Sequence, residues 1–71
     1  MSWKAEVARS KGNELFRAGS LEEALQSYAL ALQHAPADTI TFANRSLVNL
    51  KLGRWQAAEA DCSSCLAHQP K

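Results

Sequence analysis

The sequence predicts an all-α fold of two tandem antiparallel helix-turn-helix hairpins. Three observations predict this fold: an internal repeat, apolar residues at three- and four-residue spacing, and glycine or proline at the expected helix ends. The repeat has a period of 34 residues, with these identical pairs: Gly19 and Gly53, Ala24 and Ala58, Leu32 and Leu66, His34 and His68, Pro36 and Pro70. A period of this length is typical of helix-turn-helix solenoid repeats.

The first hairpin is delimited by one glycine and one proline. Its first helix is expected over about residues 3–18 and ends at Gly19, because glycine adopts a left-handed backbone without steric cost. Ser20 and Glu23 have the spacing of a capping box, in which the serine oxygen accepts a hydrogen bond from the Glu23 amide. The second helix is therefore expected to start directly after Ser20 and to end before Pro36.

The second hairpin repeats this arrangement with one weaker helix start. Its first helix is expected over about residues 39–52, with Asp38 as the N-cap and Gly53 at the end. Its second helix is expected over about residues 55–68. Arg54 stands at the cap position of that helix and cannot accept a hydrogen bond from a backbone amide, so this start lacks a side-chain cap.

These residues resemble the tetratricopeptide repeat (TPR) family over most of the chain. The matching positions are the small, glycine, aromatic and proline positions of that repeat: Gly12, Gly19, Leu21, Ala24, Tyr28, Ala31, Pro36, Gly53, Trp55, Ala58 and Pro70. The family's first-helix tryptophan is replaced by Ala8 and Phe42, and Cys62 and Cys65 replace an aromatic residue and an alanine. The resemblance implies one TPR-type α-solenoid domain over residues 1–71, with repeat one at about 5–38 and repeat two at about 39–71.

Residue size predicts how such hairpins pack. Small residues allow helix axes to approach each other, and large aromatic residues fill the space between neighbouring hairpins. We expect Gly12 to have the first role and Tyr28, Phe42 and Trp55 to have the second. The first helices of stacked hairpins then line a concave surface, where solenoid proteins usually bind peptides.

A subset of the family, the carboxylate-clamp domains of cochaperones of heat-shock proteins 70 and 90, has a further pattern. It has a basic residue and an asparagine four positions apart on the first helix, and an asparagine before an arginine on the third. Arg9 and Asn13 match the first pair, and Asn44 before Arg45 matches the second. The resemblance implies that the asparagine amides and Arg9 bind the terminal carboxylate of an acidic peptide, such as the Glu-Glu-Val-Asp ending of those chaperones.

The expected peptide site also contains apolar and basic residues on the same helices: Phe16, Leu47, Leu50 and Lys51. The family's clamp includes a lysine and an arginine from a third repeat, which would begin where this sequence ends. Neither a third repeat nor a capping helix is expected, so the predicted clamp is partial, with affinity in the millimolar range of about 4 kcal/mol. In the alternative interpretation Asn13 and Asn44 are solvated helix residues, and Arg17 and Lys51 stabilise helix C-termini.

Two other functions fit the same fold. The outward face of the last helix would include some of Ala58, Cys62, Cys65 and Leu66, and an uncovered apolar stripe commonly marks an interface. The chain would then form a homodimer through that helix. Alternatively, it is a repeat fragment of a larger scaffold protein.

Charge and hydropathy argue against other classes of partner. The net charge is +1, and no local cluster of lysine and arginine suggests binding to nucleic acid or to an anionic membrane. No apolar stretch approaches the ~18 residues of a membrane span, and no signal-peptide core follows Met1. Cys62 and Cys65 do not form the framework of a disulfide-rich secreted domain. The expected location is cytoplasmic.

No catalytic, cofactor or metal site is expected. Cys62, Cys65 and His68 have a spacing that suggests metal ligands, but a structural zinc site needs a fourth ligand. The two cysteines are interpreted as small apolar core residues of the last helix. The sequence has no phosphate-binding loop and no Ser/His/Asp arrangement, and the capping box accounts for the paired acids Glu22 and Glu23.

Overall fold

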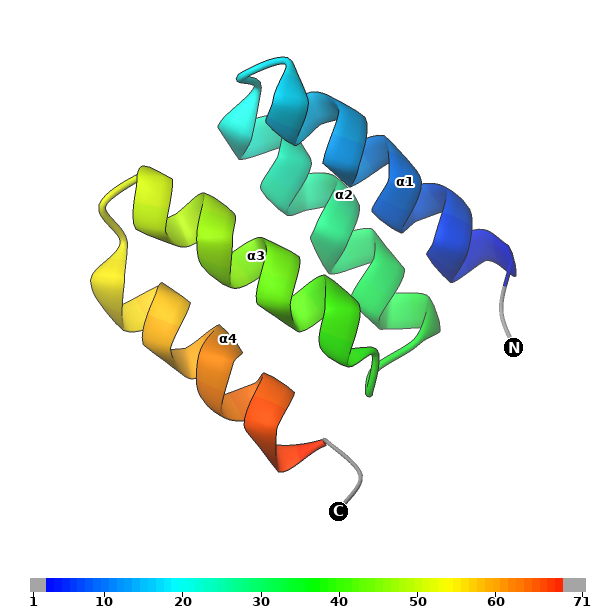
Figure 1. Cartoon of the computed structure of the whole chain (residues 1–71). Helices are drawn as coiled ribbons and strands as arrows, with labels where there is room; N and C mark the ends of the chain where they lie inside the picture. Colours follow the sequence, from blue (N-terminus) through cyan, green and yellow to red (C-terminus); the bar gives the residue numbers. More distant parts are fainter. Residues whose placement is uncertain (1–2, 69–71) are drawn as a thin grey trace.

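The computed structural model describes residues 3–68 and confirms the all-α fold (Figure 1). Its helices are α1 Trp3–Arg17, α2 Leu21–His34, α3 Thr39–Lys51 and α4 Trp55–Ala67. Helices α1, α3 and α4 each end one residue before the expected position. The expectations for the segment that begins at Met1 and for the repeat position of Pro70 concern residues outside the described range.

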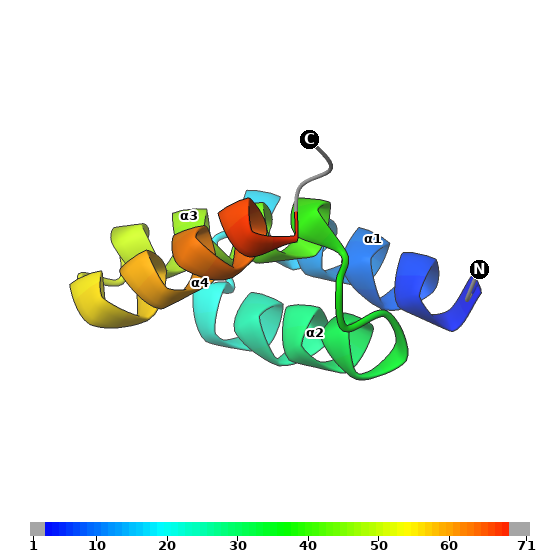
Figure 2. The ribbon, with the colours of Figure 1, turned by 90° about the horizontal axis from the view of Figure 1, so that it is seen from below.

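The helices form two hairpins that lie side by side. Helix α1 packs against α2, and α3 packs against α4. Helices α2 and α3 join the hairpins, and α1 also contacts α3. Figure 2 shows α2 below the level of α1 and α3. The backbone extends over 31 × 26 × 15 Å, so the hairpins form a plate and do not close into a bundle.

Both hairpin turns depend on a glycine with positive φ. Gly19 has φ 83° and Gly53 has φ 75°. The Gly19 amide donates to the Phe16 carbonyl at 3.1 Å, and the Ser20 amide donates to the Leu15 carbonyl at 2.9 Å. This pair of bonds is a Schellman motif, and it recurs at Gly53. The two repeats therefore end their first helices in the same way.

The capping box expected at Ser20 is wrong. Ser20 has φ −84° and ψ 70°, and its side chain makes no cap hydrogen bond. Its ψ lies outside the extended region that the N-cap Asp38 adopts with ψ 101°, so the serine oxygen is not placed to accept from the α2 amides. Arg54 also provides no side-chain cap, as expected. Its guanidinium instead forms an exposed ion pair with Glu22 of α2.

The N-cap expected at Asp38 is confirmed. The Asp38 Oδ1 accepts a hydrogen bond from the Ile40 amide at 3.1 Å, and Oδ2 accepts one from the Thr41 hydroxyl at 2.8 Å. These bonds fix the carboxylate at the start of α3 and satisfy one of the amides that a helix N-terminus leaves unpaired.

The apolar core lies between the two hairpins, close to the Gly19 turn. Ala24, Tyr28 and Val48 are buried there, and these half-buried residues pack against them: Leu15, Phe16, Leu21, Leu25 and Leu52. Tyr28 fills the space between the hairpins as expected and is 0% exposed. Its ring lies against Gly12, where a side chain would clash.

Two of the expected inter-hairpin aromatics have other positions. Trp55 is 66% exposed, because it begins α4 and, within residues 3–68, α4 packs only against α3. Phe42 is half-buried in the second hairpin, where its ring stacks on His68 with the centroids 5.9 Å apart. Neither residue fills the space between the hairpins.

The second hairpin is held together by a buried carboxylate. Asp61 is 4% exposed. Its Oδ1 accepts hydrogen bonds from Arg45 Nε at 2.9 Å and Nη2 at 2.6 Å, and its Oδ2 accepts one from Asn49 Nδ2 at 2.8 Å. The expected cysteine core is wrong: Cys62 is exposed and Cys65 is half-buried, because Asp61 and Ala58 occupy the face of α4 that packs on α3.

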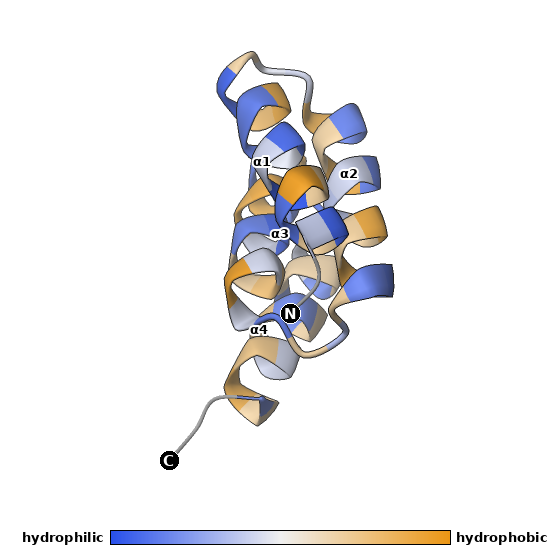
Figure 3. Cartoon of the chain, turned by 90° about the vertical axis from the view of Figure 1, so that its right-hand side faces the viewer, coloured by the Kyte–Doolittle hydropathy of each residue, from blue (hydrophilic) through white to orange (hydrophobic). Residues whose placement is uncertain are grey.

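Apolar side chains remain exposed on α4. Figure 3 shows the last turns of this helix coloured toward the hydrophobic end of the scale. Leu66 is 64% exposed there. Ala58, one of the four residues from which the outward face was expected to be drawn, is instead buried at 3% exposure. Of the four expected residues, Leu66 and Cys62 are exposed and Cys65 is half-buried.

Candidate functional site

The expected peptide-binding residues lie on α1 and α3, two helices that contact each other. Arg9 and Asn13 are one turn apart on α1, so they share a helical face. Asn44 lies on α3. The contact between the two helices brings Asn13 and Asn44 together, although they are 31 residues apart in the chain.

Asn13 is the central residue of this polar cluster. Its Oδ1 accepts a hydrogen bond from the Tyr28 hydroxyl at 2.6 Å and another from Asn44 Nδ2 at 3.1 Å. Since two donors occupy the oxygen, the amide group has a fixed orientation. Among residues 3–68, the Asn13 NH₂ group donates no hydrogen bond. This NH₂ group therefore keeps two donors for an external acceptor.

Tyr28 contacts the polar cluster from the buried side, through its hydroxyl group. Burial raises the pKa of Tyr28, and the positive charge of Arg17 only partly opposes this effect. The hydroxyl group is therefore protonated at neutral pH and donates to Asn13. From the sequence, Tyr28 was expected only as a space-filling aromatic. Its hydroxyl distinguishes it from a phenylalanine, and a buried hydroxyl group requires a partner.

Arg9 is already engaged in an ion pair. Its Nη1 lies 2.8 Å from Asp38 Oδ2, and the two side chains are 25% and 17% exposed. Burial raises the pKa of Asp38, but the Thr41 hydrogen bond, the Arg9 charge and the Ile40 amide together hold it below its ordinary value. Asp38 is thus ionised at neutral pH. The sequence predicted Asp38 only as a helix cap.

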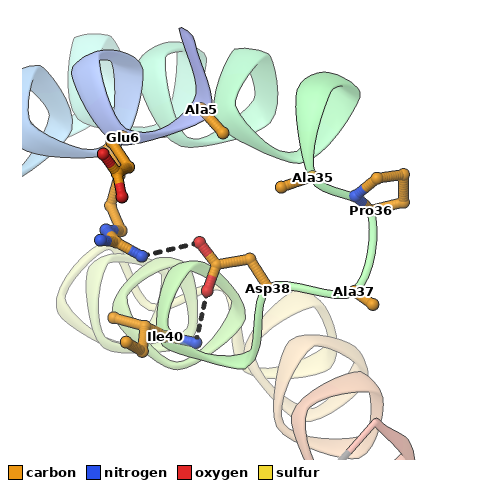
Figure 4. A pocket seen from close by; sticks show the side chains of 8 residues that line it. Ala5, Glu6, Ala35, Pro36, Ala37, Asp38 and Ile40 are labelled. Carbon is orange, nitrogen blue, oxygen red and sulfur yellow. Dashed lines mark hydrogen bonds and ion pairs between the residues drawn. The ribbon is translucent and has the colours of Figure 1, made fainter. Parts of the chain in front are cut away.

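A hollow of about 510 Å³ lies beside this ion pair. It is bounded by the start of α1, the loop between α2 and α3, and the start of α3. Its walls are mainly apolar, from Ala5, Pro36 and Ile40 among others. Figure 4 shows the Asp38 carboxylate beside the Ile40 amide at one side of the hollow. The other carboxylate oxygen accepts from Arg9 Nη1.

The apolar part of the expected site lies further along α3. Leu47 is 51% exposed and Leu50 is 45% exposed, while Phe16 is half-buried. The Lys51 Nζ lies 6.0 Å from the centroid of the Phe16 ring, which is within cation–π range. Helical spacing places Leu47 and Lys51 near the face of Asn44, whereas Leu50 is about a third of a turn away from Asn44.

Ile40 and Arg45, two other residues of α3, have roles that the sequence analysis did not assign. Ile40 is 57% exposed and precedes Asn44 by one turn, so it extends the exposed apolar surface of α3. Arg45, which forms part of the Asn-Arg match, is bound to Asp61 and is therefore structural. Its spacing of four residues from Asn49, opposite an acid of α4, was the available signal for that role.

Residues 3–68 contain neither a metal-binding cluster nor a membrane-spanning helix. No group of three or more histidine, cysteine or acidic side chains is positioned to hold a metal ion there. Among the helices of this range, none has both the length and the apolar character to cross a membrane. The α1–α3 cluster and the adjoining hollow combine polar donors with exposed apolar surface.

Comparison with known proteins relates this geometry to repeat proteins. No family model matches the sequence. The chain is 36% identical over 63 residues to the inactive TPR repeat-containing thioredoxin TTL3 of Arabidopsis thaliana. It is 33% identical over 63 residues to the mitochondrial import receptor subunit TOM34 of Rattus norvegicus. It is also 36% identical over 67 residues to the heat shock protein sti1 homolog of Schizosaccharomyces pombe.

These alignments cover most of this chain and a small part of each relative. They include 89%, 89% and 94% of the chain but only 9%, 20% and 11% of the respective relatives. The similarity thus concerns the repeat segment, and it agrees with the 34-residue period, the paired hairpins and the two glycine turns. The two hairpins of this chain are repeats of the tetratricopeptide family.

Proposed function

We propose that this chain is a non-catalytic protein-interaction module that binds the acidic C-terminal tail of a partner protein. The observation that carries the proposal is the hydrogen bonding of Asn13. Its side-chain oxygen is occupied by Tyr28 and Asn44, so its NH₂ group is oriented as a donor. A preorganised amide donor beside a second amide, with an arginine one turn away, matches the two oxygens of a terminal carboxylate.

Each residue of the proposed site has a chemical role. Asn13 and Asn44 donate to the terminal carboxylate, since Asn44 uses only one of its two amide hydrogens on Asn13. Arg9 supplies a charge-assisted bond, and Lys51 supplies a second positive charge for an acidic side chain of the ligand. Apolar side chains of the ligand contact these residues: Phe16, Leu47 and Leu50.

The names of the relatives support a chaperone-related partner. One is a heat shock protein sti1 homolog, and others are mitochondrial import receptor subunits. We therefore take the tail of heat-shock protein 70 or 90 as the proposed ligand and the cytoplasm as the proposed location. With one arginine and two amides, the expected Kd is about 1 mM.

The proposal is tested by calorimetric titration with a peptide ending in Glu-Glu-Val-Asp, either as the free acid or as the C-terminal amide. The free acid should bind and the amide should bind much more weakly. Asn44→Ala should weaken binding of the free acid by about tenfold or more, because it removes a hydrogen bond to a charged group. Gln26→Ala, which removes an exposed amide from α2, is the matched control. Equal binding of both peptides would contradict the proposal.

Self-association through α4 is a second candidate function. Its supporting observation is that Trp55 and Leu66 are 66% and 64% exposed on this helix. Large apolar side chains in solvent favour an interface. Sedimentation velocity over a range of concentrations tests this candidate: a dimer that Leu66→Glu dissociates supports it, and a monomer at millimolar concentration excludes it.

A further inference from the structure

The carboxylate of Asp38 forms an ion pair with Arg9, the arginine that is proposed to bind an acidic ligand. We infer that Asp38 is a built-in competitor: it holds Arg9 in the free protein, and a ligand carboxylate binds by displacing it. This inference rests on the proposed function and deepens it. It makes Asp38 a residue that sets which acidic ligands the site accepts.

The hydrogen bonds of Asp38 allow this exchange at low cost. Arg9 Nη1 lies 2.8 Å from Asp38 Oδ2, but the same carboxylate also accepts bonds from the Ile40 amide and the Thr41 hydroxyl. When Arg9 leaves, Asp38 keeps these two bonds and remains the cap of α3. Arg9 in turn gains an equivalent acceptor on the ligand. Neither partner is left buried without a hydrogen bond, which is the outcome that costs most.

The ion pair is also within reach of a ligand. Both side chains are partly exposed, at 25% for Arg9 and 17% for Asp38, and both border the 510 Å³ hollow. In Figure 4 the Asp38 side chain points away from Pro36 and Ala37 and toward α1, the helix that carries Glu6. A ligand carboxylate can therefore approach Arg9 without separation of α1 from α3.

The charges around Arg9 explain what Asp38 selects. Glu6 borders the same hollow, so Arg9 is the single positive group between two acids there. An acidic side chain that interacts with Arg9 alone replaces one carboxylate by another and gains little. A terminal carboxylate positioned by Asn13 and Asn44 gains amide hydrogen bonds in addition. Asp38 thus raises the preference for a chain terminus over internal acidic residues.

The test uses Asp38→Asn, because asparagine caps helices about as well as aspartate does. The substitution removes the charge and replaces the oxygen that accepts from Arg9 and Thr41 by an NH₂ group, while the other oxygen can still accept from the Ile40 amide. The Asp38→Asn protein should bind the free-acid Glu-Glu-Val-Asp peptide about fivefold more tightly than the unmodified chain. It should tighten binding of the amidated peptide by a larger factor, so the preference for the free acid falls. Glu22→Gln, which changes net charge equally and breaks the pair with Arg54, should leave both Kd values unchanged.

A double substitution shows whether Asp38 acts through Arg9. In an Arg9→Met background, Asp38→Asn should have no effect on Kd. A gain in affinity that persists without Arg9 would overturn the inference. So would unchanged or weaker binding by both Asp38→Asn and a second capping variant, Asp38→Ser. In either case, binding of the free acid by the unmodified chain would still support the proposed function. If neither the unmodified chain nor the folded Asp38→Asn protein binds the free acid, the proposed function fails as well.

Discussion

Gly12 and Tyr28 are packed so closely that no side chain fits between them. A Cβ at Gly12 would lie 2.5 Å from Cε1 and 2.6 Å from Cδ1 of the Tyr28 ring. Tyr28 cannot retreat easily, because it is fully buried and its hydroxyl is hydrogen-bonded to Asn13. The small residue at position 12 therefore connects the packing of the first hairpin to the geometry of the candidate site.

Gly12→Ala should destabilise the fold despite the better helix propensity of alanine. The propensity gain is about 1 kcal/mol, and overpacking costs about 1 to 3 kcal/mol. We expect a net loss of about 1 kcal/mol in the free energy of unfolding, measured by chemical denaturation. As a control, the same substitution in a Tyr28→Leu background should be neutral or stabilising. A net gain in the unmodified background would show that Tyr28 moves freely.

Arg45→Ala should destabilise the second hairpin through Asp61. Arg45 donates two hydrogen bonds to this buried carboxylate, and without them the charge depends on Asn49 alone. A loss of about 2 kcal/mol is expected, less than for a fully buried pair because Arg45 is 28% exposed. Arg54→Ala, which removes an exposed pair, should cost less than about 0.5 kcal/mol. Equal losses in matched thermal melts would argue against this assignment.

Ser20→Ala should have almost no effect on stability. The serine side chain makes no cap hydrogen bond to α2, so its removal leaves no amide newly unpaired. We expect a change below about 0.5 kcal/mol, compared with about 1 kcal/mol for a functional N-cap. Asp38→Ala should show the larger value, because Asp38 caps α3. A loss of about 1 kcal/mol in Ser20→Ala would show that Ser20 does cap α2.

The stability that Asp38 contributes should disappear at acidic pH. Its pKa is lowered in the folded chain, so the folded state favours the ionised form. This contribution is complete above the unfolded pKa of about 3.9 and is lost as pH falls through the lower folded pKa. The difference in unfolding free energy between the unmodified chain and Asp38→Asn should be constant near neutrality and should shrink below about pH 4. A difference that grows on acidification would contradict the ion pair.

The sequence was sufficient to predict the helices but not the side-chain contacts between them. Gly19 and Gly53 act within a few residues, as does Asp38 at the start of α3, so spacing alone located the helix ends. The Ser20 cap failed for a local reason, since the Ser20 backbone does not adopt the extended conformation of the N-cap Asp38.

The candidate site required three-dimensional information. Asn13 and Asn44 could be placed on neighbouring helices from the repeat, but the Tyr28 hydroxyl that orients Asn13 could not. The pairing of Arg9 with Asp38 joins residues 29 positions apart and depends on how α3 starts beside α1. Side-chain identity gives the candidates for such contacts, and only helix packing selects among them.

The most direct test of the central claim is an NMR titration of isotope-labelled chain with the peptide ending in Glu-Glu-Val-Asp, as the free acid and as the C-terminal amide. We predict that the free acid shifts the amide signals around Arg9, Asn13 and Asn44, including the Asn13 side-chain NH₂, and that the amidated peptide does not. The absence of shifts at millimolar free acid, or identical shifts with both peptides, would contradict the claim that these residues bind a terminal carboxylate.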